Sequence, residues 1–171
     1  MKRIIILFFA LGSILTYSQD KFKEVFTDLR TVEIAKIEKG LVQVTIDKES
    51  LIETINHHFS NEKNYFTDVE LKMEEVEKRI VYYLYFSSSL LNRNLATFLD
   101  IENNKLKLRT EDKVMIRLTS CQGIDICYPR AMINPETDKF FFSCREFIGC
   151  VDEETAQKEP CTSSGSAIFY E

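Results

Sequence analysis

Apolar side chains near the start of the chain repeat first with the period of a helix and then with the period of a strand. In 22–29 they recur at i, i+3, i+4 and i+7, which is the spacing of one helical face. In 32–37 and 41–46 they alternate with polar residues, and Gly40 lies between the two segments. Alternation is typical of half-buried strands, and glycine suits a tight turn. The pattern therefore predicts a short helix followed by a β-hairpin.

The helical period returns in residues 48–60. Leu51, Ile55 and Phe59 are four residues apart, which places them on one face of a helix. Asp47 precedes this face, and its carboxylate can accept hydrogen bonds from the free amides of a first helical turn. Residues 48–60 are therefore predicted to form an amphipathic helix.

Strand patterns dominate the rest of the chain. Apolar residues alternate in 69–73 and in 114–118, whereas "RIVYYLYF" at 79–86 is apolar or aromatic on both faces. The second pattern is typical of a central strand that is covered on both sides. The polar residues of 151–166 predict irregular structure, and the tail from 166 to 171 predicts a last short strand.

The segment "FLDIENNKLKL" at 98–108 predicts a tight hairpin. Asparagine tolerates a positive φ, which both central residues of a type I′ turn require. With Asn103 and Asn104 in the turn, the register pairs Ile101 with Leu106, Leu99 with Leu108 and Glu102 with Lys105.

A further hairpin is predicted where "YPRAMI" and "KFFFSC" flank "NPETD" at 134–138. Asn134 and Pro135 suit the first two positions of a type I turn. The elements together predict a single α+β domain over 19–171, in which one or two helices pack on a mainly antiparallel sheet.

The first 18 residues have the features of a secretory signal peptide. Lys2 and Arg3 precede an apolar run, and Thr16 and Ser18 are small residues at the positions that a signal peptidase reads. The run is shorter than the roughly 20 residues that span a bilayer. The product is therefore expected to be exported, soluble, periplasmic or extracellular, and without a membrane span once 1–18 is removed.

The charge balance narrows the expected partners. The chain has a formal net charge of −5 and no dense basic stripe. Such a surface repels phosphate backbones, so nucleic acid is not an expected partner. Another extracytoplasmic protein or macromolecule is the partner that we expect.

Five cysteines crowd the last third of the chain and predict disulfides in an oxidising compartment. Two bridges and one leftover thiol are expected from Cys121, Cys127, Cys144, Cys150 and Cys161. The C-terminal third is thus predicted to be cross-linked by disulfides.

The predicted hairpin favours one pairing of these cysteines. A tight turn about Pro135 and Glu136 sets Cys127 opposite Cys144, at a distance that a disulfide accepts. Continued pairing would set Cys121 opposite Cys150, and Cys161 would be the leftover thiol. The alternative is local pairing, Cys121 with Cys127 and Cys144 with Cys150, which the spacing does not exclude.

A metal-binding or thiol-redox protein is the alternative function. Four thiolates could come from Cys121, Cys127, Cys144 and Cys150, but zinc sites favour two to four residues between paired ligands rather than five. Redox pairs usually have the Cys-x-x-Cys spacing at the start of a helix, which neither pair has. No cofactor is therefore expected.

No motif in the chain supports a named reaction or points to a particular family. The only histidines, His57 and His58, are adjacent on a predicted helix and diverge. The leading hypothesis is a non-catalytic binding module that contacts its partner through the short loops between cysteines. The apolar residues of these loops are Ile124, Ile126, Phe147 and Ile148.

Overall fold

The structure is a computed structural model that describes residues 25–59, 66–88, 93–122, 127–146 and 161–170. One helix, α1, spans Lys48–Phe59, and ten strands account for most of the remaining described residues. The strands are β1 Glu33–Glu38, β2 Leu41–Val44, β3 Asp68–Val76, β4 Arg79–Ser88, β5 Arg93–Glu102, β6 Lys105–Leu108, β7 Met115–Gln122, β8 Cys127–Ile133, β9 Phe140–Glu146 and β10 Thr162–Phe169.

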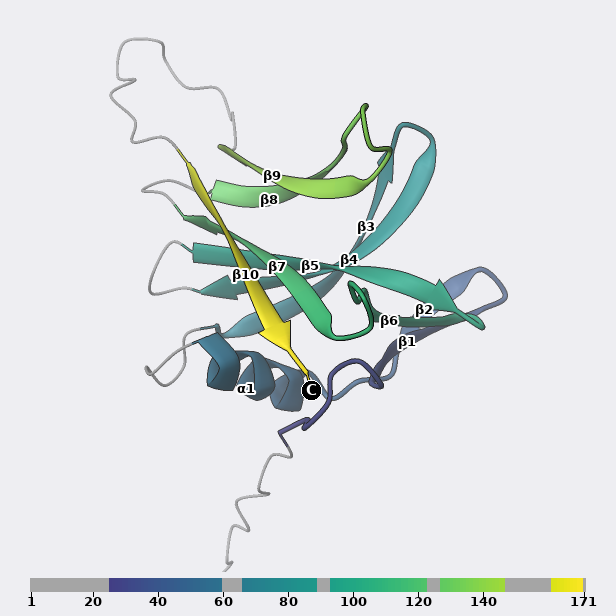
Figure 1. Cartoon of the computed structure of the whole chain (residues 1–171). Coiled ribbons are helices and arrows are strands. Elements are labelled where there is room, and N and C mark those ends of the chain that lie inside the picture. The colour runs from purple at the N-terminus through teal and green to yellow at the C-terminus, as the bar shows by residue number, and fades with distance from the viewer. Residues whose placement is uncertain (1–24, 60–65, 89–92, 123–126, 147–160, 171) are drawn as a thin grey trace, which may run out of the picture.

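Eight of the strands form one antiparallel sheet that curls into a nearly closed barrel (Figure 1). Its centre is β5, which pairs with β4 along one side. Along the other side β5 pairs first with β7, through 93–96, and then with β6, through 99–102. Strand β10 extends the β7 branch, β1 and β2 extend the β6 branch, and β3 lies beyond β4. Strands β8 and β9 form a separate hairpin.

Two layers cover the sheet from opposite sides (Figure 1). Helix α1 packs against one face, where its buried Leu51 and Ile55 join the larger apolar cluster with residues such as Phe86 and Leu118. The β8–β9 hairpin covers the other face over a smaller cluster that includes Tyr83 and Phe142. Strand β4 contributes to both clusters, which confirms the central, two-faced strand predicted from "RIVYYLYF".

The helix starts where the sequence predicts. The carboxylate of Asp47 accepts a hydrogen bond from the Ser50 N–H at 3.0 Å, which satisfies one free amide of the first turn. Within the helix, the buried Thr54 hydroxyl donates to the Ser50 carbonyl at 2.7 Å. The Thr54 oxygen also accepts the Phe26 N–H, so the helix fixes the segment before β1.

The β5–β6 hairpin confirms its predicted register. Asn103 and Asn104 have φ values of 52° and 62°, as a type I′ turn requires. The β1–β2 hairpin turns in the same way at Lys39 and Gly40, with φ values of 52° and 78°. The observed β5–β6 pairs include Leu99 with Leu108, Ile101 with Leu106 and Glu102 with Lys105.

Two predicted elements differ in the structure. Residues 25–29 are irregular rather than helical, so α1 is the only helix in the described ranges. Phe26 and the buried Leu29 still pack in the larger cluster, whereas Val25 is 40 % exposed. Residues 162–166, which were expected to be irregular, belong to β10, because β7 supplies a complete antiparallel partner for this small, polar segment.

The fold is therefore a mainly antiparallel sheet with a single helix, and α+β describes it only loosely. Within the described ranges, no helix has the length and apolarity needed to cross a bilayer. The predicted signal peptide, residues 1–18, lies outside the described residues.

Candidate functional site: a groove beside a disulfide-fastened hairpin

Two disulfides fasten the β8–β9 hairpin to one branch of the sheet. Cys144 of β9 is bonded to Cys121 of β7, with Cα atoms 5.4 Å apart. Cys127, the first residue of β8, is bonded to Cys161, which directly precedes β10; their Cα atoms are 5.6 Å apart. Both strands of the hairpin are thus covalently joined to the β7–β10 branch.

The predicted pairing of Cys127 with Cys144 is wrong, because the β8–β9 turn is longer than expected. The Asn134 side-chain oxygen accepts the N–H groups of Glu136 and Thr137, at 2.8 and 3.2 Å, and the backbone closes only at Lys139. Pairing therefore starts with Ile133 opposite Phe140. This register sets Pro129 opposite Cys144 and Cys127 opposite Glu146.

The other predicted pairings are also wrong. Cys121 is bonded neither to Cys150 nor to Cys127, and Cys161 is not the leftover thiol. Cys144 is bonded to Cys121 and therefore not to Cys150. Cys150 itself lies outside the described residues.

The same two bonds overturn the metal site made of Cys121, Cys127, Cys144 and Cys150. Three of those four sulfurs are already bonded to other sulfurs, so these cysteines do not form it. In the described part of the chain, no three or more His, Cys, Asp or Glu side chains lie together in a way that could hold a metal ion.

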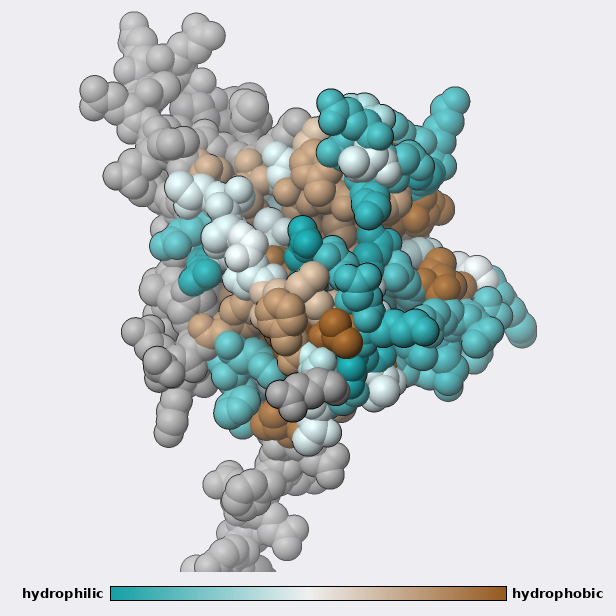
Figure 2. Space-filling view, viewed as in Figure 1, coloured by the Kyte–Doolittle hydropathy of each residue, from teal (hydrophilic) through white to brown (hydrophobic). Residues whose placement is uncertain are grey.

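An open groove of about 840 Å³ lies between the hairpin and the outer face of β7 and β10. Phe98 of β5, Thr119 of β7 and Gly165 of β10 line it from the sheet. On the hairpin side the groove is lined by parts of 134–142, and at one end by 109–112. In Figure 2 the surface over β8–β9 is mostly apolar, whereas the surface over β10 is pale and weakly polar in its upper part and apolar at its lower end.

The aromatic side of the groove is rigidly packed. The rings of Phe98 and Phe142 are stacked, with centroids 3.9 Å apart, and Tyr83 meets Phe142 edge-on at 5.3 Å. The Arg109 guanidinium lies 4.9 Å from the Phe98 centroid and 6.0 Å from that of Phe140. Aromatic pairs and cations over rings each contribute about 0.5–1.5 kcal/mol, so this cluster also fixes the hairpin on the sheet.

Polar contacts join the hairpin to the strands beneath it at both ends. At the turn, Arg79 of β4 makes two hydrogen bonds to the Asp138 carboxylate, at 2.8 and 3.1 Å. Near the start of β8, the Asn94 amide donates to the Cys127 carbonyl. The hairpin is therefore held at its tip and at its base, and not only by the disulfides.

Glu74 of β3 connects the middle of the hairpin to the sheet. Its carboxylate accepts hydrogen bonds from the Tyr83 hydroxyl at 3.3 Å and from the Ala131 N–H at 3.4 Å, and Arg130 lies 3.5 Å away. Burial raises the pKa of Tyr83 to about 12, and the negative charge of Glu74 adds to the effect. Tyr83 is thus a neutral hydrogen-bond donor at ordinary pH.

Strand β10 borders the groove with an uncharged edge. It pairs only with β7 among the described strands, and its sequence "TSSGSAIF" has neither charge nor proline. Gly165 is not at a positive φ, and a Cβ built on it would meet no atom within 4 Å. Neither backbone conformation nor crowding therefore requires glycine here, and glycine in a strand often marks close approach by another backbone or a ligand.

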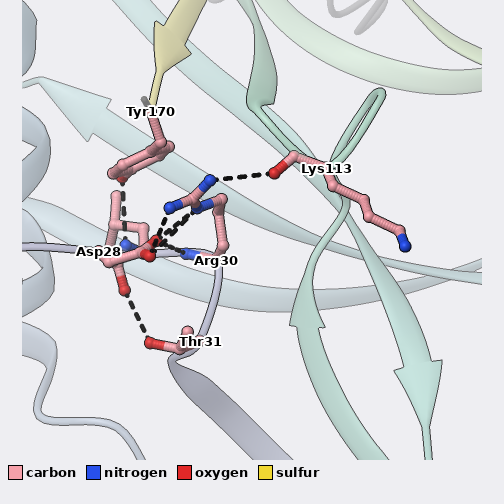
Figure 3. A network of polar contacts seen from close by, with 6 residues as sticks. Asp28, Arg30, Thr31, Lys113 and Tyr170 are labelled. Atoms are coloured by element: carbon pink, nitrogen blue, oxygen red, sulfur yellow. Dashed lines mark hydrogen bonds and ion pairs between the residues drawn. The ribbon is translucent and has the colours of Figure 1, made fainter.

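A polar network outside the groove joins the two ends of the described chain (Figure 3). The Tyr170 hydroxyl accepts the Leu29 N–H at 3.2 Å, and the Arg30 guanidinium lies 4.7 Å from the centroid of the Tyr170 ring. The Arg30 guanidinium also donates hydrogen bonds to the Asp28 carboxylate and to the Lys113 carbonyl. The hydrogen bonds from Arg30 hold the pKa of Asp28 below its ordinary value. These side chains bind one another and the backbone, so we interpret the network as one that stabilises the fold.

The apolar residues predicted to contact a partner, Ile124, Ile126, Phe147 and Ile148, lie outside the described residues. The groove itself was missed in the sequence because its residues come from five separate segments. Two signals could have directed attention to it: three consecutive phenylalanines at 140–142, and a run of small uncharged residues at 162–167.

Fold and site together define the class: a mainly antiparallel β protein with a disulfide-fastened hairpin and an open groove beside an uncharged edge strand. No family model matches the chain, and no curated protein or solved structure shows significant similarity to it.

Proposed function

We propose that the protein is an exported, disulfide-stabilised module that binds another protein by taking an extended segment of it into the groove beside β9 and β10. The observation that carries the proposal is the open cavity of about 840 Å³ whose walls are joined by two disulfides. This volume is within the range of about 300–1,000 Å³ that is common for ligand sites. The leader-like residues 1–18 and the oxidised cysteines support an extracytoplasmic setting.

Strand β10 would supply main-chain recognition. An extended peptide can pair with an open sheet edge, where backbone hydrogen bonds give affinity and alternate side chains give specificity. Proteins usually protect long edges with charged residues or proline. The other long edge of the sheet, β3, is protected in this way by Glu70, Lys72, Glu74 and Glu75, whereas β10 is not.

The groove would supply side-chain recognition. Phe141 is 41 % exposed and offers apolar contact beside the buried aromatic cluster. Lys139 and Asp112 line the groove, are exposed and make no ion pair within the described residues, so charges of both signs are available to a bound segment. A segment with an apolar residue between polar ones fits this arrangement.

The disulfides would improve binding by holding the groove in shape before the partner arrives. A site that is already ordered loses less conformational entropy on binding. Cys121–Cys144 fixes the distance between β7 and β9, and Cys127–Cys161 fixes the start of β10 relative to β8. Ile124, Ile126, Phe147 and Ile148 remain part of the proposal as further contacts, because they follow β7 and β9 in the chain.

The proposal is tested by selecting linear peptides from a random phage-displayed library on the oxidised protein. Hydrogen exchange then locates a selected peptide. We expect slower exchange at the amides of β10 and of 140–142, because a new strand protects the edge that it joins. Protection confined to other regions would overturn the assignment to this groove.

Gly165 provides a matched pair of variants. Gly165→Trp places a large side chain in open groove space, and we expect selected peptides to lose at least about tenfold in affinity. Gly165→Ala adds only a methyl group, and we expect binding within about twofold of wild type. Equal binding by all three proteins, with unchanged melting temperatures, would contradict the proposal.

A further inference from the structure

The barrel does not close between β2 and β3, and this seam contains a second cavity of about 280 Å³. Seven of its nine lining residues are aliphatic. Ile34, Leu51, Val69 and Leu84 form the deep part and belong to the larger apolar cluster, whereas Val44 at the opening is 48 % exposed. The cavity thus runs from solvent to the core between two strand edges.

Apolar surface continues from the opening along the inner face of the barrel. Strand pairing places Leu71 opposite Leu84 and Met73 opposite Tyr82, so these side chains share the face of the cavity. Met73, Ile80 and Ile101 are 64 %, 58 % and 54 % exposed. Figure 2 shows apolar side chains at the right-hand edge, between the β3–β4 hairpin and the β1–β2 hairpin.

Single exposed apolar residues are ordinary on a protein surface, but a contiguous set that leads into an apolar cavity marks a binding site. The cavity volume lies just below the usual range of about 300–1,000 Å³ for small-molecule sites, which suits one unbranched chain better than a fused-ring or two-chain lipid.

The positive charge of Lys48 favours an anionic group at the opening of the cavity. It is the first residue of α1, it lines the cavity, and within the described residues its ammonium group makes no ion pair. The other charged lining residue, Glu70, is neutralised by an ion pair with Lys72. Asp47 lies beside Lys48, but its carboxylate accepts the Ser50 N–H at the start of the helix.

We infer that the seam between β2 and β3 binds one alkyl chain that carries an anionic head group. The chain occupies the aliphatic cavity and the apolar inner face, and the head group pairs with Lys48. A fatty acid and a single-chain anionic lipid share this chemistry. The site is on the opposite side of the molecule's sheet from the peptide groove, and it does not depend on the proposed function.

The test is titration calorimetry of the oxidised protein with dodecanoate, below the concentration at which dodecanoate forms micelles. Dodecanol and dodecyltrimethylammonium, which have the same chain with a neutral or a cationic head, are the comparison probes. We expect dodecanoate to bind with one-to-one stoichiometry and most tightly of the three. Binding only above the micelle concentration, or equal affinity for all three heads, would overturn the inference.

Two variants locate the site. Val44→Trp fills the opening from an exposed position and should abolish binding, while melting temperature and circular dichroism stay as in wild type. Lys48→Glu should weaken dodecanoate binding by roughly three- to tenfold and strengthen binding of the cationic probe. Lys113→Glu, the same charge change in the β6–β7 loop, should alter neither.

Gly165→Trp separates this inference from the proposed function. It blocks the groove beside β10 and should leave dodecanoate binding unchanged. Loss of dodecanoate binding in Gly165→Trp but not in Val44→Trp would place the alkyl chain in the groove and overturn the assignment to the seam. To distinguish natural sources of the ligand, anionic single-chain lysolipid is titrated alongside dodecanoate; either source supports the site.

Discussion

Helix α1 and the β8–β9 hairpin cover opposite faces of one sheet, and different forces hold them there. The helix side has sixteen buried apolar residues in one cluster, whereas the hairpin side has six. The helix side contains no disulfide in the described residues, whereas both disulfides lie on the hairpin side. On the helix side, stabilisation comes mainly from apolar burial, which contributes about 25 cal/mol for each Å² removed from water.

The hairpin needs additional fastening because its buried cluster is small. Two disulfides, the Arg79–Asp138 pair and the Glu74 carboxylate supply it. The difference suggests that a covalent bond can replace hydrophobic area where a binding groove must stay open. The two faces should therefore respond to different perturbations.

The largest expected effect is on the helix side. Phe86 is fully buried and lies 6.0 Å from Phe66, centroid to centroid. Phe86→Ala should lower the free energy of unfolding by about 3–5 kcal/mol, because the substitution loses buried area and leaves a cavity. Urea denaturation measures the change. Phe169→Ala, at a side chain that is 71 % exposed, is the control and should cost well under 1 kcal/mol.

Removal of the β7–β9 disulfide should affect the hairpin side. Cys121→Ser with Cys144→Ser opens a loop whose ends are 23 residues apart, which costs about 3 kcal/mol in the chain-entropy model. Hydrogen exchange should become faster in β8 and β9 and stay near wild type in α1. Equal acceleration in α1 would show that the two faces are not independent. Cys150→Ser, outside both bonds, is the control.

Alkaline pH should also act on the hairpin side, through Tyr83. The pKa of Tyr83 is raised to about 12, so between pH 10 and 12 an unfolded chain releases this proton while the folded chain retains it. The folded state therefore binds more protons in this window, and its stability falls as the pH rises. Tyr83→Phe should flatten this part of the stability curve. An unchanged slope in the variant would assign the loss to other groups.

The smallest effect should come from the ion pair at the hairpin tip. Arg79 and Asp138 have side chains that are 40 % and 79 % exposed, so solvent screens their attraction. A double-mutant cycle with Arg79→Ala and Asp138→Ala should give a coupling energy of about 0.2–1 kcal/mol. A larger value would mean that solvent screens this ion pair less than its exposure predicts.

The two asparagine-containing turns show what local sequence can predict. A type I′ turn at Asn103 and Asn104 requires only that both residues have a positive φ. Asparagine tolerates this conformation, and the predicted register is confirmed. At Asn134 the side chain accepts two backbone N–H groups and lengthens the turn, which shifts the register by two residues. The cysteine pairing predicted from that register was consequently wrong.

Other features depended on contacts that no local pattern contains. The small residues of 162–166 have little tendency to form a strand alone, and β7 supplies their pairing. The bonded cysteines come from β7, β8, β9 and the residue before β10, so their mates follow from how the hairpin lies on the sheet. The groove combines Phe98, Phe140 and Gly165, which are brought together only by the same arrangement.

The contact between Tyr170 and Leu29 has a consequence for the order of folding. The two residues are 141 positions apart, and β10, which leads to Tyr170, comes last in chain order among the described strands. Long-range contacts of this kind form late, because much of the intervening chain must be ordered first. Until then, the β7 edge, the Cys127 thiol and the segment before β1 all lack their native partners. Strand β10 and Tyr170 therefore dock late in folding. Loss of Tyr170 should speed unfolding and leave the folding rate nearly unchanged, because a contact that is absent from the transition state contributes little to that rate.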